Sequence, residues 1–119
     1  TNQALCALAA TIYLSLLGKN GLKELAESNH ARAAFLHEKL SEIKGVETPF
    51  GHSFFNEFVV KIKNLENVQK KLVGKKIVFG YALESDFPPL KAHCLASVTE
   101  MNSDSQIEQL LSSLKEALK

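Results

Sequence analysis

The chain has 119 residues, of which 45% are hydrophobic, and it can therefore bury the core of one domain. Its 14 Lys and Arg residues against 13 Asp and Glu residues give a net charge of +1. That charge is too small to indicate electrostatic attraction to nucleic acid or to anionic lipid. We expect a single domain that binds neither nucleic acid nor a membrane.

The first predicted element is a helix with very few polar positions. Residues 4–17 are almost entirely apolar, and Gln3, Thr11 and Ser15 fall on one narrow stripe at helical spacing. This run is shorter than the ~20 residues of a membrane span, and no basic stretch or cleavage site marks it as a secretory signal. We expect a cytoplasmic protein in which residues 1–18 form a helix that joins this domain to a missing large domain.

A long amphipathic helix is predicted next, after a short turn that Gly18 and Gly21 bracket. Apolar residues recur at three-and-four spacing over residues 22–43, while charged side chains occupy the opposite face. Lys44 and Gly45 are expected to end this helix, because glycine readily adopts the left-handed conformation of a helix C-cap.

The repeat then changes from that of a helix to that of a strand. Residues 54–63 alternate between two faces, which predicts the most distinct strand of the chain. Asn64 is the expected cap of a short helix that Gly74 ends. Residues 76–83 predict a weak strand or an extended loop, and the Asp-Phe-Pro-Pro run at 86–89 excludes a helix there.

One further strand and one further helix are predicted in the C-terminal part. Residues 95–98 form a short apolar run, and Ser103 and Gln106 have the spacing of a capping box. The helix that follows has one apolar face over residues 107–118. The order ααβαββα predicts an α+β fold with a three- or four-stranded, mainly antiparallel sheet covered by helices.

The histidines do not have the spacing of a metal site. His30 and His37 are seven residues apart on one predicted helix, roughly 10 Å along its axis, which is too far to share an ion without a third element. His93 and Cys94 are neighbours on a predicted strand and therefore point to opposite faces. We expect no metal ligand in this chain.

The cysteines and carboxylates are weak candidates for catalysis. Cys6 and Cys94 lie in apolar segments, where a free thiol is commonly a small core residue, so we expect neither a disulfide nor a nucleophile. Glu57 and Glu100 would form an acid–base pair if their strands aligned, although carboxylates on sheets are more often solvated. We expect no catalytic residue in this chain.

The start of the first helix is the remaining candidate binding site. Thr1 and Asn2 would lie at its N-terminus, where free N–H groups and the helix dipole favour an anion such as a cofactor phosphate. Ordinary helix capping is the alternative for both residues.

Four segments carry a resemblance to a known family. They are residues 1–8 (TNQALCAL), 54–60 (FFNEFVV), the loop 80–90 and the strand 95–100. Taken in order, they span essentially the whole chain. They resemble the closing, C-terminal domain of subunit 1, the alpha or N-terminal subunit, of the glycine cleavage system P-protein, a pyridoxal-phosphate glycine dehydrogenase (decarboxylating).

The resemblance implies a fold type I pyridoxal-phosphate enzyme, the aspartate aminotransferase architecture, with residues 1–119 as its single small C-terminal domain. Such a complex decarboxylates glycine and transfers the aminomethyl group to the lipoyl arm of the H-protein. In the split form of the family, subunit 2 supplies the lysine that holds the cofactor. This chain would then hold no pyridoxal phosphate and would form part of the interface with subunit 2.

Two features of the chain agree with an incomplete active site. None of its 13 lysines lies in a context that resembles a cofactor lysine. Arg32, the only arginine, does not resemble the arginine that many fold type I enzymes keep for a substrate carboxylate.

Two alternatives remain open from the residues alone. One is a free-standing α+β ligand-binding or interaction domain, because fold does not determine function. The other is the small domain of a different fold type I enzyme, such as a cysteine desulfurase or an aminotransferase. Under the leading hypothesis we expect the first helix to expose an apolar contact surface.

Overall fold

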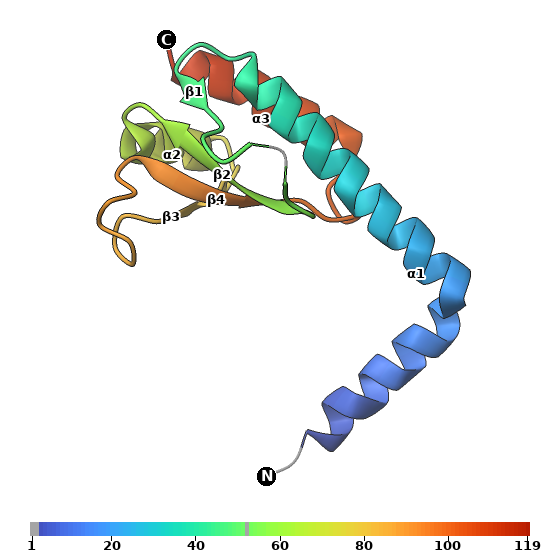
Figure 1. Ribbon diagram of the computed structural model, residues 1–119. Coiled ribbons are helices and arrows are strands. Elements are labelled where there is room, and N and C mark those ends of the chain that lie inside the picture. Colours follow the sequence, from blue (N-terminus) through green and yellow to red (C-terminus); the bar gives the residue numbers. More distant parts are fainter. Residues whose placement is uncertain (1–2, 52) are drawn as a thin grey trace.

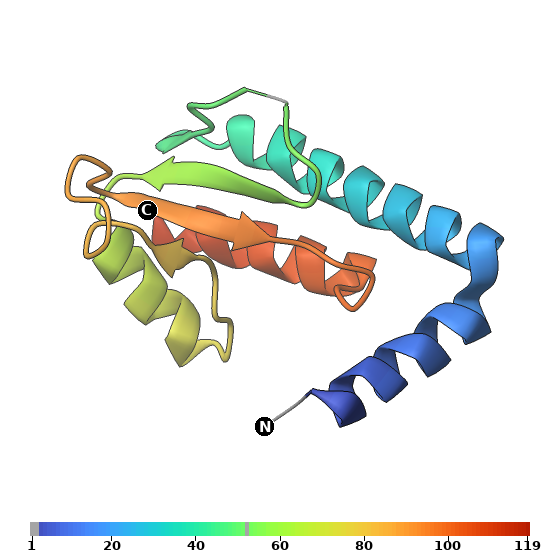
Figure 2. The ribbon, with the colours of Figure 1, turned by 60° about the horizontal axis from the view of Figure 1, so that its bottom comes forward.

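The computed structural model describes residues 3–51 and 53–119, which form one antiparallel sheet covered by helices (Figure 1). The sheet has four strands in the order β1-β2-β4-β3. Figure 2 shows the helices behind one face of this sheet. The predicted α+β class and antiparallel pairing are confirmed. The elements are α1 (Ala4–Ser41), β1 (Val46–Glu47), β2 (Glu57–Ile62), α2 (Leu65–Gly74), β3 (Tyr81–Ala82), β4 (His93–Ser97) and α3 (Asp104–Ala117).

The core lies between the helices and the two central strands. Alternate residues of β2 and β4 point toward the helices, and the register places Val60 opposite Cys94 and Phe58 opposite Ala96. All four side chains are buried, whereas their neighbours along each strand are exposed or half-buried. The sheet therefore buries one face and leaves the other open, as antiparallel sheets commonly do.

Helix α1 contains the break that the sequence predicts, but the break is narrower than expected. Gly18 has φ 60° and ψ −172°, a conformation that is essentially restricted to glycine. It divides α1 into an N-terminal half, residues 4–17, and a C-terminal half, residues 19–41. Gly21 lies within the helix, so one residue rather than a four-residue turn changes the chain direction.

Several predicted boundaries shift where tertiary contacts override local pattern. Helix α1 ends at Ser41, although Ile43 beyond it is still buried. Strand β2 begins at Glu57 instead of residue 54, because Phe54 packs its ring against histidines of α1. Strand β1 was not predicted, since two residues are too few to show a period.

The two later helices begin close to where the sequence places them. Asn64 precedes α2 as expected, but it has a left-handed conformation (φ 56°) and makes no capping hydrogen bond. The capping box of α3 is confirmed. The backbone N–H of Gln106 donates to Ser103 Oγ (3.3 Å), and the backbone N–H of Ser103 donates to Gln106 Oε1 (2.9 Å).

The substitution Ser103→Ala is expected to lower the free energy of unfolding by about 1 kcal/mol, because it leaves an N–H group at the start of α3 without its acceptor. Urea denaturation monitored by circular dichroism measures the change. Ser112→Ala is the matched control on the exposed side of the same helix, and it should change stability by less than about 0.5 kcal/mol. Equal effects at the two positions would contradict a stabilising capping box.

Candidate functional site

The most unusual surface of the molecule is the N-terminal half of α1. This half extends away from the sheet and the other helices in both views (Figures 1 and 2). Leu5 is 79% exposed, Leu8 57% and Leu16 82%. Every residue from Gln3 to Leu16 is exposed. We call its large apolar side chains the α1 apolar surface, which consists of Leu5, Leu8, Ile12, Tyr13, Leu14 and Leu16.

This helix has little to hold it in place by itself. One of its side-chain hydrogen bonds stays within the helix, where Thr11 Oγ1 donates to the carbonyl of Ala7 (2.8 Å). A helix of about 14 residues is marginal in water without packing, while burying each leucine would contribute about 1.5–3 kcal/mol. The α1 apolar surface is therefore suited to contact another protein surface, as the sequence predicts.

By length and composition alone, helix α1 could also span a membrane. It has 38 residues, and one stretch of 18 residues within it has a mean hydropathy of 1.3. The break at Gly18 nevertheless limits the apolar half to 14 residues, or about 21 Å at 1.5 Å per residue. A bilayer core is about 30 Å thick. The geometry favours a protein contact over a membrane span.

The sheet register does not place the two candidate carboxylates opposite each other. Glu57 pairs with Ser97 across β2 and β4, and Glu100 lies in the turn beyond the end of β4. Both carboxylates are exposed. Thr1 and Asn2 lie outside the described residues, so the anion site at the start of the first helix stays a prediction.

The two histidines of α1 fasten the helix to the segment before β2. His30 Nδ1 lies 2.9 Å from the carbonyl oxygen of Phe55, and the two rings stack with an interplanar angle of 7°. His37 is buried, with its ring centroid 5.0 Å from that of Phe54 and 5.1 Å from that of Phe58. Residues 3–51 and 53–119 contain no cluster of three or more His, Cys, Asp or Glu side chains that could hold a metal.

The two cysteines have opposite environments, which corrects one prediction. Cys94 is fully buried as expected, and burial raises the pKa of its thiol to about 12. Cys6 was expected in the core but is exposed, because the helix that carries it extends away from the body. Both thiols are free. His93 and Cys94 alternate across the sheet as predicted, with Cys94 on the buried face.

Arg32 connects helices instead of facing a binding site. Its guanidinium donates a hydrogen bond to the carbonyl of Asn102 and lies 3.6 Å from Asp104. Both partners flank the start of α3, so the arginine ties α1 to the N-terminus of that helix. Its side chain is thereby occupied within the fold, in agreement with its poor resemblance to a substrate-binding arginine.

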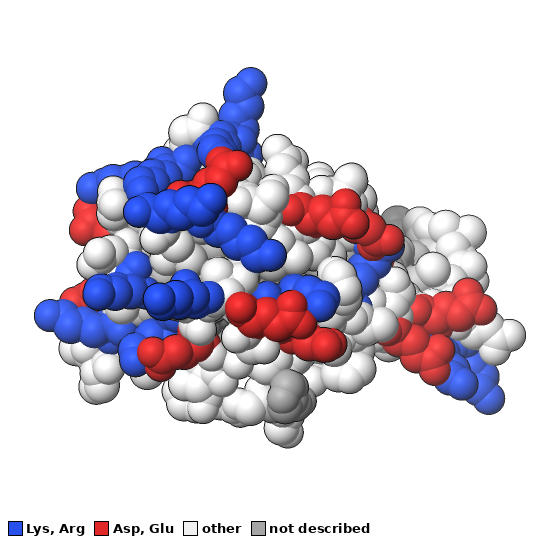
Figure 3. All heavy atoms as spheres, turned by 90° about the horizontal axis from the view of Figure 1, so that it is seen from above, with Lys and Arg blue, Asp and Glu red and all other residues white. Residues whose placement is uncertain are grey.

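The lysines do not fit covalent attachment of pyridoxal phosphate. Lysines that form Schiff bases are typically buried, which keeps part of the amine uncharged. Here every lysine is exposed except Lys39 and Lys61, which are half-buried and ion-paired with Glu42 (2.8 Å) and Glu47 (2.9 Å). Figure 3 shows basic side chains projecting into solvent over one end of the molecule.

Comparison with known proteins adds independent information. The chain matches the family model described as "Glycine cleavage system P-protein" over residues 1–114. It is 41% identical over 115 residues to a Geobacillus kaustophilus protein named "Probable glycine dehydrogenase (decarboxylating) subunit 1", covering 96% of this chain and 25% of that protein. A Dictyoglomus turgidum protein of the same name is 40% identical over 121 residues, covering 100% and 27%. The chain thus spans about a quarter of these curated relatives.

Solved structures agree with the sequence relatives. A glycine decarboxylase (P-protein) of the glycine cleavage system, in inhibitor-bound form, superposes with a TM-score of 0.86 at 31% identity, covering 99% of this chain and 27% of that one. A C-DES mutant with glycine covalently linked to its PLP cofactor has a TM-score of 0.65 at 15% identity, covering 79% of this chain and 24% of that one. The second likeness shows the fold alone. The family match over nearly the whole chain, with relatives of about 40% identity, shows that this chain belongs to the glycine cleavage system P-protein family.

Proposed function

We propose that residues 1–119 form the small C-terminal domain of a glycine dehydrogenase (decarboxylating) subunit 1, and that the helix over residues 1–18 joins it to the large domain. The relatives that carry this name are about four times as long as the match. The P-protein structure contains the same fold as 27% of a longer chain. Both observations support a domain that acts within a larger subunit.

The complete enzyme would decarboxylate glycine in the cytoplasm and transfer the aminomethyl group to the lipoyl H-protein. Pyridoxal phosphate would supply the electron sink for this reaction. The exposed or ion-paired lysines of this chain support our assignment of the cofactor to the partner, subunit 2. We infer that the chain's own contribution is packing and subunit contact, which the exposed apolar side chains of α1 support.

The α1 apolar surface carries this proposal. It presents six large apolar side chains, each 49% or more exposed, on a half-helix that extends away from the sheet (Figures 1 and 2). Exposed apolar surface of this kind on a soluble protein commonly marks a contact region. We infer that the large domain of subunit 1 covers most of it, and that the interface with subunit 2 is continuous with that contact.

Glycine-dependent exchange of labelled bicarbonate tests the function of the complete enzyme. Full-length subunits 1 and 2, mixed with lipoyl H-protein, should catalyse this exchange. Deleting the segment corresponding to residues 4–119 from subunit 1 should abolish it. If the intact complex showed no exchange, the fold type I alternatives, a cysteine desulfurase or an aminotransferase, would be preferred.

Borohydride reduction tests the assignment of the cofactor. Reduction converts a lysine Schiff base of pyridoxal phosphate into a stable secondary amine that mass spectrometry can locate. We expect subunit 2 in the complex to carry the reduced cofactor, and the 119-residue chain to carry none above the level found after denaturation. A specific, stoichiometric adduct on a lysine of this chain would overturn the assignment.

A further inference from the structure

Val78 is 89% exposed, the highest value among the large apolar side chains that the structure describes. It is even more exposed than Leu5 (79%) and Leu16 (82%) on the α1 apolar surface. Single exposed hydrophobic residues are common on protein surfaces and need no explanation. Val78 differs from such residues, because hydrogen bonds fix its position and because it lines a cavity.

A Schellman motif at the end of α2 fixes the position of Val78. The N–H of Lys76 donates to the carbonyl of Val73 (2.8 Å), and the N–H of Ile77 donates to the carbonyl of Leu72 (3.0 Å). Lys76 has the left-handed conformation that this motif requires (φ 61°). Ile77 packs against the core, and Val78, the next residue, is left outside it.

The residues after Val78 are also held in place. Phe79 is buried, and its carbonyl accepts a hydrogen bond from the side-chain amide of Gln69 (2.9 Å). The carbonyl of Gly80 accepts a second bond from the same amide (3.0 Å). Residues 77–80 therefore form a fixed rim from which Val78 projects into solvent.

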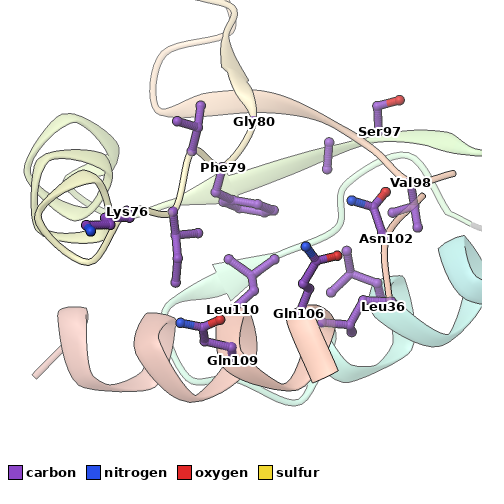
Figure 4. A pocket seen from close by; sticks show the side chains of 14 residues that line it. Leu36, Lys76, Phe79, Gly80, Ser97, Val98, Asn102, Gln106, Gln109 and Leu110 are labelled. Atoms are coloured by element: carbon purple, nitrogen blue, oxygen red, sulfur yellow. The ribbon is translucent and has the colours of Figure 1, made fainter. Parts of the chain in front are cut away.

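A cavity of about 270 Å³ lies between this rim, the end of β4 and helix α3 (Figure 4). For comparison, an engineered cavity of roughly 150 Å³ with apolar walls is large enough to bind benzene. Protein interiors are otherwise close-packed, with few voids larger than a water molecule. A space of this size beside the core is therefore suited to hold a side chain. Its apolar wall consists of Leu36, Phe79, Ala96, Val98, Ile107 and Leu110.

Two side-chain amides border the apolar wall. The Oδ1 of Asn102 accepts from the N–H of Thr99 (2.9 Å), and the Oε1 of Gln106 accepts from the N–H of Ser103 (2.9 Å). With both oxygens engaged, the NH2 groups of these side chains are the donors at the cavity. A segment that inserts an apolar side chain could therefore bond a main-chain carbonyl to them.

We propose that an apolar side chain from the large domain of subunit 1 fills this cavity, and that Val78 packs against the same segment. The inference rests on the proposed function, in which residues 1–119 are one domain of a longer subunit. The chain spans about a quarter of its curated relatives. Most of such a subunit lies outside this chain and is available to cover the cavity.

The placement of α1 favours the large domain over a separate molecule. In both views the N-terminal half of α1 extends on the β3 side of the sheet, away from β1, and residues 77–80 lead into β3 (Figures 1 and 2). A body that covers the α1 apolar surface would therefore lie on the same side as the cavity. A segment of the same chain is also present at a high effective concentration, which a separate partner is not.

Thiol labelling at residue 78 tests the proposal. Val78→Cys is combined with Cys6→Ser, and mass spectrometry quantifies the modified peptide. In the isolated chain residue 78 should react rapidly, because it is mostly exposed. In full-length subunit 1, without subunit 2, it should react at least about tenfold more slowly. Ser112→Cys is the control on the exposed side of α3, outside the cavity, and it should react equally in both.

Filling the cavity from within the chain separates insertion of a side chain from contact with the rim alone. Leu110 is half-buried and lines the cavity from α3 (Figure 4). Leu110→Trp should occupy the space and raise the labelling rate of residue 78 in full-length subunit 1 toward that of the isolated chain, while Ser112→Trp should not. Thermal melting checks that each variant is folded. The labelling of Val78→Cys alone still decides the proposal if Leu110→Trp does not fold.

Equal labelling of residue 78 in the isolated chain and in full-length subunit 1 would overturn the proposal. Protection that appears only after subunit 2 is added would also overturn it, because the cavity would then belong to the contact with the partner. Unchanged protection in a folded Leu110→Trp variant would show that no side chain enters the cavity. Bicarbonate exchange and the protection of Cys6 report separately on the proposed function, and both would persist if this inference alone failed.

Discussion

Replacing Gly80 by alanine is expected to lower the free energy of unfolding by about 3 kcal/mol or more. Gly80 has φ +67°, a region that costs an L-residue roughly 1–2 kcal/mol. An alanine Cβ would also lie 2.7 Å from Cys94 Sγ and 2.9 Å from Cys94 Cβ. Cys94 is fully buried in the sheet, so it cannot move aside without disturbing the core. Overpacking of this kind typically costs about 1–3 kcal/mol more.

Gly74→Ala is the matched control for this substitution. Gly74 ends α2, and a Cβ added there would have no atom within 4 Å. Alanine should therefore be neutral or slightly stabilising at this position. Thermal melting of the two variants measures the difference, which should exceed about 10 °C for a domain of this size. Similar melting temperatures of the Gly80→Ala and Gly74→Ala variants would contradict the close packing of Gly80 against β4.

Leu8→Glu combined with Leu16→Glu is expected to have little effect on the isolated chain and a large effect on the complete subunit. Both side chains are mostly exposed here, so the melting temperature of the 119-residue chain should change by less than about 2 °C. In full-length subunit 1 the two leucines would be buried against the large domain. Losing that burial, roughly 1.5–3 kcal/mol for each side chain, should lower the melting temperature markedly and reduce bicarbonate exchange.

Val73→Glu controls for the added charge. Val73 is 57% exposed and lies on α2, away from the α1 apolar surface. It should leave both the isolated chain and the complete subunit unchanged in stability. If the double leucine variant behaved like this control in full-length subunit 1, helix α1 would not be buried there and our account of its role would be wrong.

Local patterns were sufficient for those elements that depend on neighbouring residues in the chain. The break at Gly18 follows from a backbone conformation that only glycine adopts readily, and the capping box at Ser103 follows from a contact across three residues. The repeat of β2 was visible because one of its faces is buried and the other is not. These features could be read from composition and spacing.

Features that depend on distant residues could not be predicted in this way. The exposure of Cys6 depends on how far α1 extends from the sheet, which no local repeat records. The hydrogen bonds of the Gln69 amide to the carbonyls of Phe79 and Gly80 join α2 to the segment before β3, and no local repeat indicates them. Strand β1 has two residues and no detectable period, whereas the two residues of β3 lie within residues 76–83, where the sequence predicts a weak strand or an extended loop.

Two of the segments that carry the family resemblance lie at constrained places in the fold. Residues 54–60 lead into and form most of the central strand β2, and Gly80 lies against Cys94. The site residues were harder to predict, because the chain's contribution is a surface and not a cluster of reactive groups. Only the apolar character of residues 4–17 indicated that surface from the sequence.

The reactivity of Cys6 toward a thiol reagent tests the central claim most directly. Cys6 is exposed on the helix that carries the α1 apolar surface, whereas Cys94 is buried with a thiol pKa of about 12. In the isolated chain at pH 8, one thiol should react rapidly, and Cys6→Ser should remove that reaction. In full-length subunit 1 the same thiol should be protected about 100-fold or more, as expected for burial in a stable domain contact. Equal reactivity of Cys6 in the isolated chain and in the full-length subunit would contradict the account.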